Sequence, residues 1–207
     1  MSLFVTFEGG EGSGKSTAIK SLVDKLQKEG YEIVLTREPG GTPISEQIRE
    51  VILNKENTAM DPITEALLYA ASRRQHVVEK VRPALEEGKV VLCDRFVDSS
   101  LAYQGGARGL GIDLILKINE PAIDGLWPDV TIFFDLKPEV GLARISANSG
   151  REVNRLDIEK MEFHQKVRTS FLELAKRYPE RYVIIDASKS RDEVVEETYN
   201  AIKAKLK

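Results

Sequence analysis

The sequence predicts an α/β protein built on a doubly wound, five-stranded parallel sheet that is flanked by helices. Five short runs rich in β-branched and aromatic residues alternate along the chain with longer helical stretches. Each run is apolar almost without interruption, which is typical of strands buried on both faces of a parallel sheet. In sheets of this kind, ligands bind at the carboxyl ends of the strands. The chain has 207 residues, so we expect residues 1–207 to form a single domain.

The individual elements follow from these patterns in chain order. Strands are expected at residues 3–8, 32–36, 89–94, 130–135 and 182–186. Helices are expected at residues 15–29, 44–53, 62–87, 113–123, 138–147, 158–177 and from 191 to the end. Gly30 and Gly88 follow two of these helices, where glycine commonly ends a helix, and Pro83 is expected to kink or divide the third. The polar, glycine-containing segment 147–155 is expected to be a short mobile lid.

Composition and charge narrow the class of protein. Apolar residues make up 42% of the chain and charged residues 30%, and no apolar run is long enough to span a bilayer. The net charge of −3 argues against a surface that binds duplex nucleic acid. The N-terminus carries no basic leader region, and the single cysteine, Cys93, lies in an apolar run where a small buried residue is expected. We therefore expect a cytoplasmic protein whose partners are small molecules.

A glycine-rich segment after the first strand carries the clearest chemical signal. Residues 9–16, GGEGSGKS, match G-x-x-x-x-G-K-[ST] and lie between a predicted strand and a predicted helix. Glycines let backbone amides converge on phosphate oxygens, and the following helix N-terminus favours negative charge. Lys15 is expected to reach the β- and γ-phosphates, and the Ser16 hydroxyl to hold Mg²⁺. The motif thus predicts a nucleoside triphosphate site, the P-loop, formed by Gly9, Gly10, Glu11, Gly12, Ser13, Gly14, Lys15, Ser16 and Thr17.

A second group of polar residues ends the third strand. Asp94 follows an apolar run, so its carboxylate is expected beside the P-loop, where it could organise Mg²⁺ and its waters. Arg95 offers a fork of donors suited to a phosphate, although an Asp–Arg ion pair that caps the strand is the structural alternative. Arg49 is a further candidate cation, or else a solvated helix residue.

Residues that could hold a flat heterocycle follow on a helix and on a polar stretch. Tyr69 and Arg73 are four residues apart, so they share one helix face and could stack on and hydrogen-bond to such a ring, whereas Arg74 points elsewhere. The amide of Gln104 can donate and accept, which suits the edge of a pyrimidine, and Tyr103 could pack on a sugar. A Tyr-Gln pair before two glycines is also typical of a simple turn.

Other P-loop classes fit the sequence poorly. A guanine-nucleotide switch needs Asn-Lys-x-Asp at a strand end, but the single Asn-Lys pair, at residues 54–55, precedes Glu-Asn in a helix-to-loop region. An ATP-driven nucleic-acid motor would need more chain and a basic groove. A small kinase, whose acceptor site is built from the same strand tips, remains.

Six segments together resemble the thymidylate kinase family. GGEGSGKST, TREPGGT, AASRRQH, CDRFVDSSLAYQGG, DGLWPD and NRLDIE occur in that family's order and spacing, over essentially the whole chain. The resemblance implies a P-loop kinase fold, phosphoryl transfer from ATP to dTMP with Mg²⁺, and a homodimer. It also implies that Arg49 and Arg95 grip the dTMP 5′-phosphate. Phe96 stands where many members carry tyrosine.

The resemblance assigns the nucleoside pocket as well. Tyr69 would stack on thymine, Arg73 and Gln104 would read its edge, and Tyr103 would crowd the 2′ position of the sugar. Ser100 would line the same pocket, and Glu38 would belong to the dTMP site.

A catalytic arginine is expected from the lid. The P-loop interior carries no positive charge except Lys15, while the lid offers Arg151 and Arg155, which are otherwise solvated loop charges. We expect one of them, Arg151 in preference, to close onto the ATP phosphates.

Two rival functions remain open at this point. A deoxynucleoside kinase would use a carboxylate base, Glu11 or Glu38, on a 5′-hydroxyl, and a catalytically silent nucleotide-binding regulator would transfer nothing. His76 and His164 lie in no motif, and surface or packing roles are expected for both.

Overall fold

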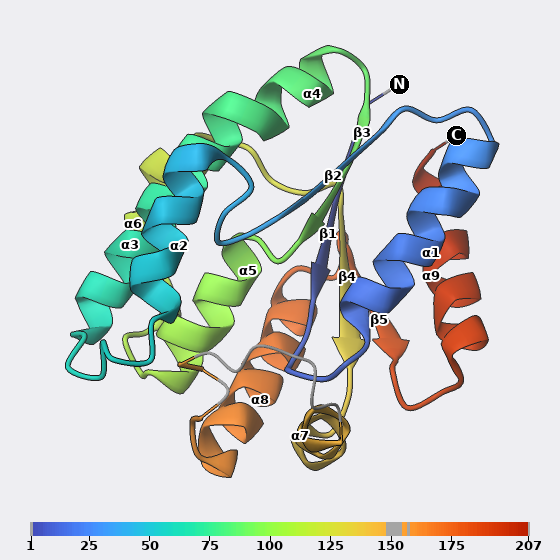
Figure 1. Cartoon of the computed structure of the whole chain (residues 1–207). Coiled ribbons are helices and arrows are strands. Elements are labelled where there is room, and N and C mark those ends of the chain that lie inside the picture. The colour runs from blue at the N-terminus through green and yellow to red at the C-terminus, as the bar shows by residue number, and fades with distance from the viewer. Residues whose placement is uncertain (1, 148–154, 157, 207) are drawn as a thin grey trace.

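The computed structural model describes residues 2–147, 155–156 and 158–206, and within them five parallel strands form one sheet (Figure 1). The strand order is β2-β3-β1-β4-β5, so β1 is the central strand, with β3 and β2 on one side and β4 and β5 on the other. In the central register, Val5 lies between Leu92 on β3 and Val130 on β4. The strands are β1 (Leu3–Glu8), β2 (Ile33–Arg37), β3 (Val90–Asp94), β4 (Val130–Asp135) and β5 (Tyr182–Asp186). The predicted doubly wound α/β fold is confirmed.

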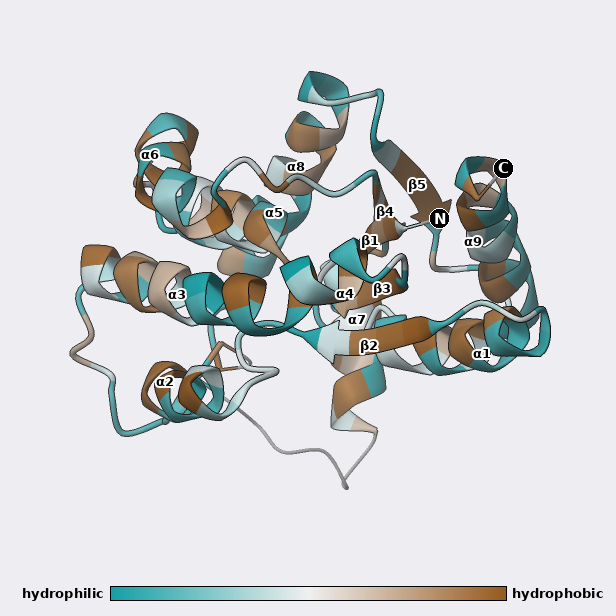
Figure 2. Cartoon of the chain, turned by 90° about the horizontal axis from the view of Figure 1, so that it is seen from above, coloured by the Kyte–Doolittle hydropathy of each residue, from teal (hydrophilic) through white to brown (hydrophobic). Residues whose placement is uncertain are grey.

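Helices cover both faces of this sheet (Figures 1 and 2). One face is covered by α1 (Lys15–Lys28) and α9 (Arg191–Lys205). The other face and its flank carry α2 (Pro43–Leu53), α3 (Pro62–His76), α4 (Arg82–Glu86), α5 (Val97–Ser100), α6 (Ile112–Ile123) and α8 (Met161–Arg177). A further helix, α7 (Pro138–Ser146), follows β4 at the carboxyl edge of the sheet.

The apolar character of the inner strands β1, β3 and β4 follows from burial on both faces, whereas the edge strands β2 and β5 are partly exposed, contrary to the prediction that every strand is buried. All six residues of β1 are buried, and successive side chains point to opposite sides of the sheet. Val5 and Phe7 pack with Leu22 of α1, while Phe4 packs with Phe96 on the other side. The P-loop starts from the carboxyl end of this buried strand. Among the described residues, no helix is both long and apolar enough to cross a lipid bilayer.

The long helix predicted at residues 62–87 is divided, as Pro83 indicated. It ends as α3 at His76, widens into a π-helical turn at Val77–Val81 and resumes as α4. Proline has no N–H to donate to the preceding turn, and a wider turn before it accommodates the missing hydrogen bond. Gly30 and Gly88 follow α1 and α4 with φ angles of 90° and 81°, a region in which glycine is favoured, so the predicted stop signals are also confirmed.

Residues 97–107 differ from the irregular polar stretch that the sequence indicated. They form α5 and then a π-helical segment, Leu101–Ala107, which carries Tyr103 and Gln104. Two glycines near its end lower helix propensity, so local preference gave no helical signal. Packing overrides that preference: a Cβ on Gly106 would lie 1.9 Å from Oγ of Ser170 on α8, so only glycine allows the two helices to approach.

Candidate functional site

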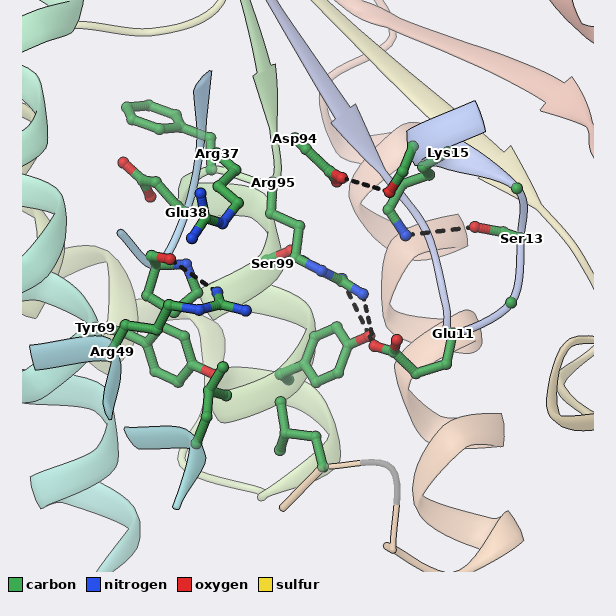
Figure 3. Close-up of a pocket in the computed structure, with 18 of the residues that line it drawn as sticks. Glu11, Ser13, Lys15, Arg37, Glu38, Arg49, Tyr69, Asp94, Arg95 and Ser99 are labelled. Carbon is green, nitrogen blue, oxygen red and sulfur yellow. Dashed lines mark hydrogen bonds and ion pairs between the residues drawn. The ribbon is translucent and has the colours of Figure 1, made fainter. Parts of the chain in front are cut away.

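A cavity of about 610 Å³ opens at the carboxyl ends of β1, β2 and β3 (Figure 3). It is lined by most of the residues that the sequence predicted: Glu11, Gly12, Ser13, Gly14, Lys15, Ser16, Thr17, Glu38, Arg49, Tyr69, Arg73, Asp94, Arg95, Tyr103 and Gln104. Four other predicted residues, Gly9, Gly10, Ser100 and Arg155, are not part of its lining. Arg37 and Arg144 line the cavity too, and the sequence analysis gave neither a role in it.

The P-loop runs from β1 into the N-terminus of α1. Gly12 has a φ of 69°, and a Cβ there would lie 2.1 Å from the carbonyl oxygen of Gly141 on α7, so a glycine is required. Lys15 Nζ donates to the carbonyl oxygens of Gly9 at 3.0 Å and Gly10 at 3.2 Å. Burial, assisted by the positive charge of Arg95, lowers the pKa of Lys15 to about 8. The loop therefore holds a desolvated cation, which an anionic ligand would stabilise.

Asp94 lies at the side of the P-loop (Figure 3), and Ser16 meets it there. Ser16 Oγ donates to Oδ2 of Asp94 at 3.2 Å. The other carboxylate oxygen, Oδ1, is buried and has no hydrogen-bond partner among the described residues. No group of three or more His, Cys, Asp or Glu side chains in the described part of the chain could hold a metal by itself. One hydroxyl and one carboxylate fit Mg²⁺, which retains waters and takes further oxygens from nucleotide phosphates.

Arg95 connects the tip of β3 to the P-loop. Its backbone has a φ of 68°, which is uncommon for a residue with a side chain, and its amide donates to the Phe7 carbonyl at 3.0 Å. The guanidinium donates to Glu11 at 2.6 Å, to the Gly9 carbonyl at 3.1 Å and to the Tyr103 hydroxyl at 3.1 Å. Arg95 thus pairs with Glu11, and the alternative of a capping pair with Asp94 does not form.

Two further arginines reach the cavity from the β2–α2 region (Figure 3). Arg49 Nη1 donates to the Pro39 carbonyl at 2.9 Å, which fixes the direction of its guanidinium. Arg37 pairs with Glu46 at 2.9 Å and is half exposed. Arg49 is therefore placed at the cavity wall, close to Tyr69 in Figure 3, and is not simply a solvated helix residue.

Arg73 is almost completely buried, with 1% of its surface exposed. It donates to Glu38 at 2.7 Å, to Ser100 at 3.1 Å and to the Phe96 carbonyl at 3.1 Å, and also to Asn119. These bonds use Nε–H, both hydrogens of Nη1 and one hydrogen of Nη2, so the guanidinium is tightly held at the cavity wall. Arg74 is on the surface beside Asp124, as expected.

Both histidines are buried. Of the two roles that the sequence allowed, packing is therefore confirmed and a surface position is not. His76 is hydrogen-bonded to Glu38 at 2.9 Å and to Thr36 at 2.7 Å, which makes it part of the network around Arg73. His164 lies on α8, and 4% of its surface is exposed. Cys93 is buried in β3, as predicted.

Gln104 and Tyr103 project from the π-helical segment. Gln104 is 2% exposed, and its Nε2 donates to Oε1 of Glu65 on α3 at 2.7 Å. The Tyr103 hydroxyl donates to Glu11 at 3.1 Å while it accepts from Arg95. Glu65 was missed by the sequence analysis, because a lone glutamate near a helix start is usually a solvated or helix-favouring residue.

Of the two lid arginines, Arg155 lies among the residues that the structure describes and Arg151 does not. Arg151 lies outside the described residues, as do the other residues of 148–154. Arg155 is 7% exposed; its Nε donates to the Ile52 carbonyl at 3.0 Å and its Nη2 bonds to Glu65. The expectation that either arginine acts on ATP phosphates stays a prediction.

The fold and the cavity together define a class. A parallel sheet of this strand order, with a P-loop between β1 and α1 and with arginines converging on the same cavity, is that of a P-loop kinase. The sequence model of the thymidylate kinase family matches residues 7–198. The chain belongs to the thymidylate kinase family.

Individual relatives agree over the full length. A thymidylate kinase of Bacillus licheniformis is 60% identical over 205 residues, which cover 99% of this chain and 97% of the relative. One of Clostridium novyi is 58% identical over 200 residues, 97% of this chain and 98% of that one. The crystal structure of thymidylate kinase from Ehrlichia chaffeensis is 34% identical, covers 98% of both chains and has a TM-score of 0.79.

Proposed function

We propose that this chain transfers the γ-phosphoryl group of ATP to the 5′-phosphate of dTMP, giving ADP and dTDP. The observation that carries the proposal is that one cavity is lined both by P-loop residues and by Tyr69, Arg73 and Gln104. Arg95 lies between the two parts and contacts both the P-loop carbonyl of Gly9 and Tyr103. Donor and acceptor sites therefore share one arginine.

On the donor side, the P-loop binds the phosphates of ATP. Residues 9–17 supply backbone amides, and Lys15 supplies the charge that neutralises the transferring group. Mg²⁺, held through Ser16 and Asp94, would supply further neutralisation of the phosphate oxygens. The buried, unpartnered Oδ1 of Asp94 supports this position for the ion.

On the acceptor side, Arg95 and Arg49 hold the 5′-phosphate of dTMP. Tyr69 stacks on thymine, and Gln104 and Arg73 read its edge. Glu38 and Ser100 contribute by fixing Arg73, a role that their hydrogen bonds to it support. Tyr103, held by Glu11 and Arg95, packs against the deoxyribose.

No general base is needed, because a phosphate acceptor is already ionised at neutral pH. Catalysis then consists of positioning and charge neutralisation. A deoxynucleoside kinase would require a carboxylate that is available to a 5′-hydroxyl. Glu11 is engaged by Arg95 and Tyr103, and Glu38 is engaged by Arg73 and His76, which disfavours that rival.

The proposal is tested by comparing acceptors in a continuous assay of ADP release with ATP and Mg²⁺. We expect dTMP to give the highest kcat/KM among dTMP, dUMP, dCMP and thymidine. Thymidine as the better acceptor would establish the deoxynucleoside kinase, and the absence of ADP release with every acceptor would leave only nucleotide binding.

Of the two lid arginines, we propose that Arg151 supplies the catalytic charge. The support is indirect: Arg155 is engaged by Glu65 and by the Ile52 carbonyl, so its guanidinium already has buried partners. Residues 147–155 form the proposed lid of a single domain that spans residues 1–207.

We further propose a cytoplasmic homodimer without nucleic-acid or membrane partners. In Figure 2, α2, α3 and α6 lie in a row on one flank of the molecule, with apolar residues along them. Val51 on α2 and Ile63 and Leu67 on α3 are 46%, 45% and 53% exposed. Light scattering coupled to size-exclusion chromatography should give twice the chain mass of 23.2 kDa, and a mass of one chain would contradict the dimer.

Gln104→Ala is expected to raise the KM for dTMP about tenfold and to weaken the preference for dTMP over dCMP. A buried amide discriminates because the wrong base leaves polar groups unpaired. Steady-state kinetics with both nucleotides measure the effect. Arg74→Ala, on the exposed face of the same α3 helix that carries Arg73, is the control and should change neither constant; an Arg74→Ala effect as large as that of Gln104→Ala would refute the assignment of base recognition.

A further inference from the structure

Glu65 is a buried carboxylate at the centre of a charged network beside the cavity. It lies in the first turns of α3, and 1% of its surface is exposed. Gln104 Nε2 donates to its Oε1 at 2.7 Å, and Arg108 approaches both carboxylate oxygens at 3.4 Å. Arg155 completes the set through its bond to Oε2. Three elements that are distant in sequence therefore meet at one carboxylate.

The charge state of Glu65 follows from these partners. Burial alone would raise the pKa of the carboxyl group, but the hydrogen bonds from Gln104 and Arg155 and the charge of Arg108 outweigh burial and lower it. The group is thus ionised at neutral pH. An ionised carboxylate only accepts hydrogen bonds, so the atom of Gln104 that faces it must be the amide nitrogen and not the amide oxygen.

The orientation of Gln104 decides what the cavity offers to a base. The side-chain amide of Gln104 is planar and its nitrogen faces Glu65. Its carbonyl oxygen therefore points away from Glu65 and is available as an acceptor. Thymine carries a donor at N3, which matches this acceptor. Cytosine carries a lone pair at N3, which would oppose the amide oxygen and leave both groups unpaired.

We propose that Glu65 is a positioning residue that sets base specificity by holding the Gln104 amide with its oxygen toward the base. The inference rests on the proposed function, since it concerns the base of the proposed acceptor. Arg108 and Arg155 act through Glu65 by keeping it ionised. Glu65 itself does not touch the nucleotide.

Glu65→Gln tests the proposal because it preserves shape but removes the obligate acceptor. A glutamine side chain can donate to the Gln104 oxygen, which allows the Gln104 amide to turn and present its nitrogen to the base. The probes are dTMP and 5-methyl-dCMP, which keeps the methyl group and reverses the hydrogen-bonding pattern at N3 and C4. We expect the ratio of their kcat/KM values to fall at least about tenfold, with affinities from calorimetry changing in the same sense.

Glu159→Gln is the matched control. Glu159 pairs with the same Arg108 at 2.6 Å, and Gln104 is bonded to Glu65 instead, so the ratio should stay within about twofold of wild type. A Glu65→Gln protein that loses rate on both nucleotides equally would show a merely structural role and overturn the proposal. Wild-type protein that does not phosphorylate dTMP would contradict the proposed function instead, and the calorimetric ratio would then decide the inference.

A second variant keeps the test decisive should Glu65→Gln lower the melting temperature below the assay range. Glu65→Asp retains the charge opposite Arg108 but withdraws the carboxylate from Gln104 by one methylene. We expect its dTMP to 5-methyl-dCMP ratio to fall at least about threefold. An unchanged ratio in folded Glu65→Asp would overturn the proposal.

Discussion

Replacing Lys15 with alanine is expected to lower kcat at least about a hundredfold while the fold survives. The ammonium is the charge that the P-loop directs at the transferring phosphoryl group, and alanine supplies no charge at that position. Its replacement should cost little stability, because burial already opposes its positive charge and lowers its pKa to about 8. Steady-state kinetics at saturating nucleotides and thermal unfolding measure the two effects.

Lys28→Ala, at the exposed end of the same helix, is the control and should retain wild-type kcat. A Lys15→Ala protein that keeps more than about a tenth of the wild-type activity would contradict the charge-neutralising role.

Arg95→Ala is expected to lower kcat/KM for dTMP by about two to three orders of magnitude. The guanidinium is already oriented by Glu11, Gly9 and Tyr103, so a phosphate meets a fixed fork of donors. Charge-assisted hydrogen bonds contribute about 1.5–3 kcal/mol each, and a bidentate contact has two. Alanine also carries a Cβ at the same positive φ, so the backbone at this position is no more strained than with arginine.

The measurement is kcat and KM for dTMP and for ATP separately. KM for dTMP should rise and kcat should fall, with KM for ATP changing less. The surface variant Arg74→Ala sets the baseline, and an Arg95→Ala loss below about tenfold would remove Arg95 from the acceptor site.

Much of the fold could be predicted because its signals are local. Apolar runs predicted the five strands to within one residue, because strands of a parallel sheet covered by helices are mostly apolar. The division of the third helix at Pro83 was likewise readable from one residue. Residues 97–107 were not, because packing against α8, with Gly106 against Ser170, overrides a weak local preference.

The site shows the same contrast. The P-loop could be predicted because its function needs consecutive residues, and Asp94 and Arg95 because they end a strand. Glu65 could not, because it meets Gln104 and Arg155 only through the tertiary arrangement, 39 and 90 residues apart in sequence. Arg73 was expected at the base edge, but its bonds to Glu38 and Ser100, which hold it so tightly, depend on the same long-range packing.

The most direct test of the central claim follows the phosphoryl group itself. Wild-type protein is incubated with Mg²⁺, dTMP and ATP labelled in the γ-phosphate, and the products are separated by chromatography. The account predicts that the label moves to the β-phosphate of dTDP, in amounts equal to the ADP formed. Label that appears only in inorganic phosphate would contradict the account. So would a protein that labels dTMP when thymidine is supplied but never forms labelled dTDP.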